Sequence, residues 1–148
     1  MSLRPKLIAL LAAVAACAAP AVAETPKTQT ILPGYWEYTN TVSFLITQTK
    51  VERRCVKPAE IDRFFSGPRN HHYTCTYPTR IVGGGRAEFD GTCVDKKGRT
   101  VAVTASGTYA PTHFKLNARI KANLGGVPIA PSAVMEARRI GDVCPAEG

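Results

Sequence analysis

The amino-acid sequence predicts a mainly β fold: a single domain of about seven antiparallel strands, arranged as a meander that curves into a partly open barrel. Apolar and polar residues alternate through most of residues 33–140, which is the pattern of strands with one buried face. Residues 58–65 have the spacing of an amphipathic helix, so one short helix is expected after the second strand. Glycine-rich and polar turns separate the alternating segments at short intervals, which favours a sheet built from hairpins.

The first two strands are expected at residues 36–42 and 48–56. Trp36 and Tyr38 begin the first strand, because aromatic residues favour extended structure. Trp36 is expected to anchor this strand in the core, where its indole N–H needs an acceptor; a place in a ligand-binding wall is the alternative. The turn between the two strands carries no glycine or Asn-Gly signal, so its position is weakly defined.

The expected helix covers residues 58–65. Pro58 suits the first helical position, and Glu60 lies near the positive end of the helix dipole. The residues at helical spacing that form one apolar face are Ile61, Phe64 and Phe65. Gly67 and Pro68 then end the helix. We expect the apolar face to lie against the sheet as a plug.

Five further strands are expected at residues 72–82, 86–94, 100–109, 114–121 and 133–140. The three glycines at 83–85 mark the turn of a hairpin between the first two of them. This alternation requires a dry concave face and a wet convex face. The concave face either is filled by its own side chains or holds an apolar ligand. A seal made by Phe64, Phe65, Val101 and Phe114 would favour the filled state.

The N-terminus has the order of a secretory signal peptide. Arg4 and Lys6 precede an apolar run over residues 7–16, and an A-x-A sequence ends at Ala23. Cleavage is therefore expected before Glu24, which would place the mature protein in the periplasm or outside the cell.

A lipobox at residues 14–17 is the alternative, in which Cys17 is acylated and anchors the protein to a membrane. No later segment has the roughly 18 consecutive apolar residues of a membrane span, so no transmembrane segment is expected after signal removal. The expected organisation is a signal peptide at 1–23, a flexible leader at 24–32, a β domain at 33–144 and a C-terminal tail at 145–148.

The mature protein is expected to be basic. Of 19 Lys and Arg residues two lie in the signal, so the net charge against 11 Asp and Glu is 17 − 11 = +6. No run of Lys and Arg exceeds a pair, so nucleic acid is not an expected partner. A basic surface favours anionic partners such as lipid headgroups, or simply keeps the protein soluble. The candidate anion-facing patch around the expected helix consists of Arg53, Arg54, Lys57, Arg63 and Arg69.

Four cysteines follow the signal, and in an oxidising compartment they predict two disulfides. They are Cys55, Cys75, Cys93 and Cys144, whose gaps lack the close pairs of a zinc site. We favour the pairs Cys55–Cys75 and Cys93–Cys144, because neither bridge encloses the other. The main rival joins Cys75 to Cys93, which are equidistant from Gly84 and would oppose each other in a symmetric hairpin.

Candidate catalytic chemistry is sparse. His71 and His72 are adjacent, so on a strand they would face opposite sides and would rarely share a metal with His113. Residues 83–85 lack the Lys-Ser/Thr pair and the following helix of a phosphate-binding loop. Acidic residues such as Glu37 show no spacing typical of an acid–base pair. The sequence therefore assigns no catalytic residue, metal ligand or cofactor.

Three short motifs and the cysteine frame resemble those of a known family. The expected domain opens with a P-G-x-W-E sequence whose distinctive members are Pro33, Gly34, Trp36 and Glu37. Residues 54–60 hold Arg-Cys-Val followed by Pro-Ala-Glu, and residues 139–144 resemble an R-x-G-x-C ending through Arg139 and Gly141. Over residues 33–144 the chain is similar to domain of unknown function 3617, a family of small exported proteins of Gram-negative bacteria. The resemblance implies an exported β domain without an established activity.

Many members of that family have Met-rich central strands. Here Met135 is the only methionine after the signal, so a Met-based copper or redox role gains no support.

We expect a non-catalytic periplasmic or secreted domain that binds an apolar or anionic envelope component, or a protein partner. The first alternative is an envelope-directed hydrolase, which convergence of Glu37, His72 and His113 in one pocket would support. The second alternative is an acylated lipoprotein with a structural role in the envelope.

Overall fold

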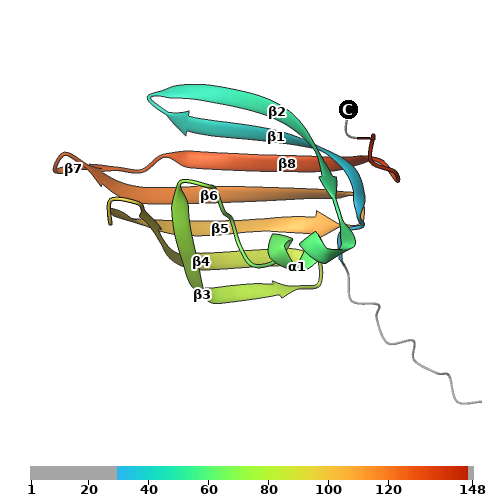
Figure 1. Ribbon diagram of the computed structural model, residues 1–148. Coiled ribbons are helices and arrows are strands. Elements are labelled where there is room, and N and C mark those ends of the chain that lie inside the picture. Colours follow the sequence, from blue (N-terminus) through green and yellow to red (C-terminus); the bar gives the residue numbers. More distant parts are fainter. Residues whose placement is uncertain (1–29, 147–148) are drawn as a thin grey trace, which may run out of the picture.

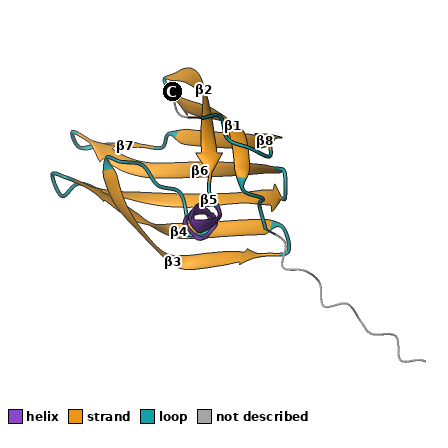
Figure 2. Ribbon diagram, turned by 45° about the vertical axis from the view of Figure 1, so that its right-hand side comes forward, coloured by secondary structure: helices purple, strands orange, loops and turns teal. Residues whose placement is uncertain are grey.

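A computed structural model describes residues 30–146 of the protein. It shows one antiparallel sheet of eight strands, curved but not closed, with a short helix over its concave face (Figures 1 and 2). The predicted fold class is therefore confirmed. The expected signal peptide, its cleavage site at Ala23 and Glu24, the alternative lipidation site Cys17 and most of the leader lie outside the described residues.

The strands are β1 (Gly34–Phe44), β2 (Ile46–Val56), β3 (Tyr73–Gly83), β4 (Arg86–Asp95), β5 (Thr100–Ala110), β6 (His113–Leu124), β7 (Val127–Ile129) and β8 (Ser132–Gly141). The helical segment consists of a 3-10 turn, η1 (Pro58–Glu60), and one α-helical turn, α1 (Ile61–Phe64). It lies after the second strand, as predicted. Neither helical element within residues 30–146 is long and apolar enough to cross a membrane. The short strand β7 is additional to the predicted set.

The strand order differs from a simple meander. The order across the sheet is β2-β1-β8-β6-β5-β4-β3, and the eighth strand, β7, lies off this path and pairs with β6. The strands β2 and β3 thus form the two edges although they follow each other in the chain. The connection between them, which carries α1, crosses the concave face from one edge to the other (Figure 1). The first strand pairs with the last one, because Tyr35 lies opposite Gly141 and Ser43 lies opposite Ser132. Alternation indicates which residues form strands, but it does not select their partners.

The β3–β4 and β1–β2 hairpins have turns of different composition. In the β3–β4 turn Gly84 and Gly85 have φ values of 57° and 77°, the backbone that a two-residue hairpin loop requires. This turn was predicted. The β1–β2 turn instead centres on Leu45, whose φ is 27°. A non-glycine residue rarely adopts this conformation, so the sequence gives no signal for the turn. Each strand continues two residues further towards the turn than expected, because β1 ends at Phe44 and β2 begins at Ile46.

Two glycines on the concave face allow neighbouring strands to approach closely. A Cβ atom at Gly107 would lie 1.9 Å from the carbonyl oxygen of Lys115, and one at Gly91 would lie 2.0 Å from that of Thr76. Any larger residue would push the adjacent backbone away. The tight curvature of β4 and β5 therefore depends on the missing side chains at these positions.

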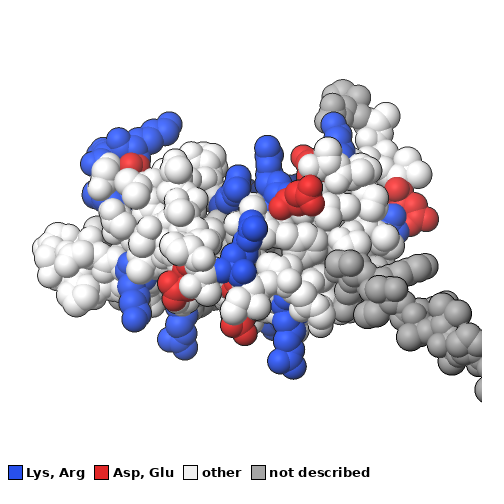
Figure 3. Space-filling model, turned by 90° about the horizontal axis from the view of Figure 1, so that it is seen from below, with Lys and Arg blue, Asp and Glu red and all other residues white. Residues whose placement is uncertain are grey.

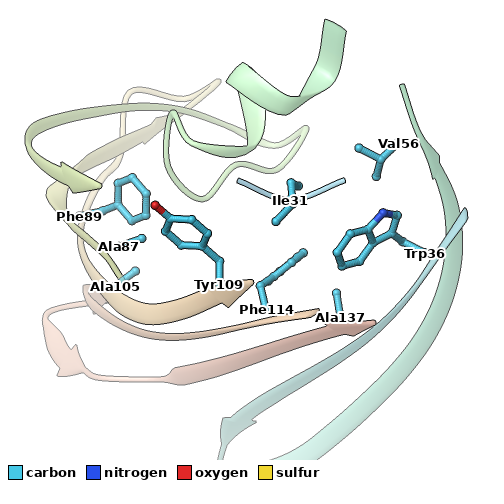
Figure 4. Packing of buried hydrophobic residues seen from close by; sticks show 9 residues of the cluster. All are labelled: Ile31, Trp36, Val56, Ala87, Phe89, Ala105, Tyr109, Phe114 and Ala137. Atoms are coloured by element: carbon cyan, nitrogen blue, oxygen red, sulfur yellow. The ribbon is translucent and has the colours of Figure 1, made fainter. Parts of the chain in front are cut away.

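The hydrophobic core lies between α1 and the concave face of the sheet (Figure 4). Its buried members are Ile31, Trp36, Val56, Ala87, Phe89, Ala105, Tyr109, Phe114 and Ala137. The predicted plug is confirmed, because the ring of Phe64 lies 4.4 Å from that of Phe114 and the ring of Phe65 lies 4.9 Å from that of Tyr109.

The folded domain begins earlier than predicted. Ile31 is completely buried, and the backbone N–H of Leu32 donates to the carbonyl oxygen of Pro111 at 2.9 Å. The sequence places both residues in a flexible leader that ends before Pro33. That boundary is wrong by at least two residues, because two aliphatic residues in a polar stretch gave too little periodicity to be assigned to the core.

The favoured disulfide pairing is wrong. The bridges join Cys75 to Cys93 and Cys55 to Cys144, rather than Cys55 to Cys75 and Cys93 to Cys144. Cys75 and Cys93 are directly opposed in the β3–β4 hairpin, so the rival prediction from their symmetric spacing is confirmed. Disulfides of this kind form and persist in oxidising compartments.

The second bridge follows from the pairing of the first and last strands. Tyr35 on β1 lies opposite Cys55 on one side and opposite Gly141 on the other. Cys144 follows Gly141 closely and comes within reach of Cys55, so that their Cα atoms are 5.5 Å apart. Cys55 has no similar proximity to Cys75, because β2 and β3 are at opposite edges of the sheet.

Candidate functional site

The concave face is hollowed beside α1 by an open cavity of about 290 Å³. Its apolar lining residues are Ile31, Val56, Phe64, Phe65, Ala87, Phe89, Tyr109, Phe114, Leu116 and Met135. They come from the sheet on one side and from the helical segment on the other. The aromatic residues expected to seal the face thus line a cavity, which lies near the lower end of the roughly 300–1,000 Å³ range of small-molecule sites.

Three arginines border this cavity: Arg54 on β2, Arg63 in α1 and Arg69 in the following loop. Arg54 forms an ion pair with Glu52, and its guanidinium carbon lies 5.7 Å from the centre of the Tyr38 ring. Arg63 and Arg69 form no ion pair with any side chain in residues 30–146. The cavity therefore combines an apolar interior with guanidinium groups that have spare capacity to bind an anion.

Other charged residues at the cavity are already engaged. Glu60 accepts a hydrogen bond from the backbone N–H of Lys57 at 2.8 Å, which fixes its carboxylate at the start of the helical segment. Lys115 also borders the cavity, but its ammonium group pairs with Glu136 at 2.6 Å. The net charge left at the border is thus positive.

The loop that carries Arg69 is held by a tyrosine on β3. The hydroxyl of Tyr77 donates to the carbonyl oxygen of Pro68 at 2.7 Å, and its ring packs against Phe89. Burial raises the pKa of Tyr77, while the nearby positive charge of Arg69 acts in the opposite direction. At neutral pH the phenol therefore stays protonated and keeps the donor that positions the loop.

The predicted anion-facing patch is divided by the sheet. Arg54, Arg63 and Arg69 lie at the cavity, whereas Arg53 and Lys57 do not line it. Arg53 is adjacent to Arg54 in a strand, so the two side chains point to opposite faces. The crowding of arginines was visible in the sequence, but the structure shows that Arg54 is the one of the two that faces the cavity.

On the convex face, Glu37 links three strands. Its carboxylate accepts hydrogen bonds from Arg53 on β2 at 3.0 Å and from Arg138 on β8 at 2.7 Å. The hydrogen bonds from Arg138 and then from Arg53 lower the pKa of Glu37 below its usual range. A carboxylate held in this way is a poor proton donor or acceptor near neutral pH.

The residues expected for the hydrolase alternative do not meet in the cavity. Glu37, His72 and His113 are all missing from its lining. Arg138 lies between Glu37 and His113 in the strand register, and His72 is in the loop before β3, where its ring contacts that of His71 in a tilted arrangement. Within residues 30–146, no group of three or more His, Cys, Asp or Glu side chains is arranged to hold a metal ion.

The two terminal motifs form a seam between the first and last strands. Trp36 is fully buried, and its indole N–H donates to the carbonyl oxygen of Leu32 at 2.9 Å, which confirms the predicted core role. The Nε atom of Arg139 donates to the carbonyl oxygen of Pro33 at 2.8 Å, and its guanidinium also pairs with Asp142. Gly34 begins β1 where β8 ends at Gly141, so the motif residues fix the joint between the two ends of the domain.

Fold and site together define a class of protein: an open, disulfide-bonded antiparallel β domain with an apolar cavity beneath a helical plug. A family model described as "Protein of unknown function (DUF3617)" matches residues 31–144, and the chain belongs to this family. The matched segment begins at the buried Ile31, in agreement with the observed start of the domain. No curated protein and no solved structure matches the chain.

Proposed function

We propose that the protein is a non-catalytic binding domain for an anionic amphiphile. The apolar tail occupies the cavity, and the acidic headgroup lies at Arg54, Arg63 and Arg69. The observation that carries the proposal is the coexistence of an open apolar cavity with two arginines that have no acidic partner in the described part of the chain.

The cavity provides affinity for the tail, and the arginines provide selectivity for the headgroup. Each CH₂ group that leaves water for the cavity contributes about 0.8 kcal/mol, so the tail supplies most of the affinity. The guanidinium groups bind carboxylate or phosphate oxygens in a bidentate manner and select against neutral or cationic headgroups. Since the arginines are largely exposed, salt would weaken this selection.

The two disulfides and the expected signal peptide support an exported, periplasmic or secreted location. Amphiphiles with acidic headgroups are abundant in a bacterial envelope, and a protein that shields the tail of one from water would be useful there. This is the class of ligand that we propose.

The proposal is tested by displacement of a fluorescent fatty acid with dodecanoate, dodecanol and dodecyltrimethylammonium. We expect dodecanoate to bind more tightly than the other two. The double variant Arg63→Gln/Arg69→Gln should weaken dodecanoate about tenfold and leave dodecanol unchanged. Leu116→Trp should fill the cavity and weaken both ligands.

Arg80→Gln is the matched control, because Arg80 is an exposed arginine on β3 that does not line the cavity. It should bind all three ligands as the wild type does. Equal binding of the three headgroups would contradict the role of the arginines. Unchanged binding in a folded Leu116→Trp variant would contradict the role of the cavity.

A further inference from the structure

Two turns at one end of the sheet expose large aliphatic side chains. Leu45 in the β1–β2 turn is 93% exposed and Ile46 beside it is 68% exposed. Leu124 and Val127, which flank the β6–β7 turn, are each 60% exposed. We call these four residues the apolar tips.

The register places both turns at the same end of the molecule. Ser43, just before the β1–β2 turn, lies opposite Ser132, and only two residues separate the end of β7 from Ser132. Figure 1 shows the β1–β2 turn and β7 on the left-hand side, away from the C-terminus on the right. The apolar tips thus protrude from one end of the sheet and do not form part of its concave or convex face.

Basic side chains accompany the apolar tips. Lys96 and Lys97 lie in the β4–β5 turn, and Lys121 lies on β6 opposite Ala102, near the start of β5. None of the three lysines forms an ion pair with a side chain in residues 30–146. Figure 3 shows uncharged surface at the left-hand end of the molecule with basic side chains grouped beside it.

Asp95, which directly precedes Lys96 in the chain, is bonded to other groups. The carboxylate of Asp95 accepts hydrogen bonds from the backbone N–H groups of Lys97 and Arg99 and pairs with the Arg99 side chain at 2.6 Å. It therefore closes the β4–β5 turn and is not free to neutralise Lys96 or Lys97.

The fold itself gives no reason for a leucine at position 45. The side chain is almost fully exposed, so it contributes little to packing. Its φ of 27° would be adopted more easily by glycine or asparagine. A residue that is unfavourable both for solubility and for backbone conformation indicates a contact outside the folded domain.

We propose that the apolar tips and their lysines dock on the surface of an anionic lipid bilayer. The tips enter the boundary between headgroups and acyl chains, and Lys96, Lys97 and Lys121 bind the acidic headgroups. A bilayer suits this geometry better than a protein groove, because the apolar side chains lie on two separate protruding turns. None of these residues lines the cavity, so the proposal does not depend on the amphiphile site.

The test is sedimentation of the protein with vesicles of phosphatidylcholine, with or without phosphatidylglycerol. The wild type should bind vesicles that contain phosphatidylglycerol, bind pure phosphatidylcholine weakly, and dissociate as salt is raised. The double variant Leu45→Gly/Ile46→Ser should lower the partition coefficient at least about tenfold, because it removes the inserted aliphatic carbons. Lys96→Gln/Lys97→Gln should reduce only the preference for the anionic vesicles.

Val143→Ser is the matched control: Val143 is 82% exposed but lies near the opposite end, beside the Cys55–Cys144 bridge. It should bind vesicles as the wild type does. Glycine at position 45 suits the turn, so the tip variant should keep its melting temperature, and a loss of binding then cannot be attributed to unfolding. A wild type that ignores both vesicles, or a tip variant that binds like the Val143 control, would overturn the proposal.

Discussion

At the scale of single residues, the two ends of the domain are joined by individual hydrogen bonds. Glu37 joins the edge strand β2 to β8 through Arg53 and Arg138, and Arg139 holds the carbonyl group of Pro33. The Arg138 and Arg139 bonds cross the seam between the first and last strands, and the Arg53 bond ties the edge strand β2 to β1. Glu37 thus serves to hold strands together on the convex face, away from the cavity where binding is proposed.

Stability should therefore fall in acid partly through Glu37. Because the arginines lower its pKa in the folded state, Glu37 stabilises the fold above its unfolded pKa, and this contribution is lost as pH falls through the folded value. From about pH 5 downwards the melting temperature of the wild type should drop more steeply than that of Glu37→Gln. Glu52 and Asp95 also have lowered pKa values, so the melting temperature of both proteins should still fall with pH to some extent.

The measurement is thermal unfolding by circular dichroism between pH 3 and pH 7. Glu88→Gln serves as the control, because Glu88 is an exposed glutamate of β4 with no ion pair among the described residues. Its pH profile should follow the wild type. Parallel profiles for Glu37→Gln and the wild type would show that the Arg53 and Arg138 contacts do not persist in solution.

At the scale of elements, most strands are predictable because a sheet with one buried face imposes a period of two on the sequence. The helix and the β3–β4 turn are predictable from proline, helical spacing and glycine. The β1–β2 turn at Leu45 carries no such signal, and β7 is too short for a period to be visible. For the cavity, the inward residues and the arginine cluster were visible in the sequence, whereas the selection of Arg54, Arg63 and Arg69 as the arginines that border it required the structure.

The curvature of β5 gives a prediction at this scale. Gly107→Ala should destabilise the protein by about 1–3 kcal/mol, because the new methyl group would collide with the Lys115 carbonyl group and force the strands apart. Gly83→Ala is the control, since nothing lies within 4 Å of a Cβ atom at that position. Urea denaturation of the two variants measures the difference. Equal midpoints would mean that β5 and β6 can separate without loss of stability.

At the scale of the whole molecule, the first and last segments of the domain are joined to each other although the sheet stays open. β1 pairs with β8, and Cys55–Cys144 locks that pairing at the end where the terminal motifs meet. Such long-range partners leave no trace in local sequence, which is why the favoured disulfide pairing was wrong and the place of β1 beside β8 was not predicted. Because β2 and β3 are at opposite edges, the connection that carries α1 must cross the concave face. This connection forms one side of the cavity.

The two disulfides should therefore differ in their effect on global stability. Cys55–Cys144 spans a sequence separation of 89 residues, and Cys75–Cys93 spans 18. Restriction of the unfolded chain then contributes about 4.6 kcal/mol for the first bridge and about 3.2 kcal/mol for the second. Guanidinium denaturation should show that Cys55→Ala/Cys144→Ala loses more stability than Cys75→Ala/Cys93→Ala. The hairpin keeps its strand pairing without its bridge, whereas the seam loses the covalent tie between β2 and the C-terminal segment. The reverse order of stabilities would mean that the seam is held by β1–β8 pairing alone.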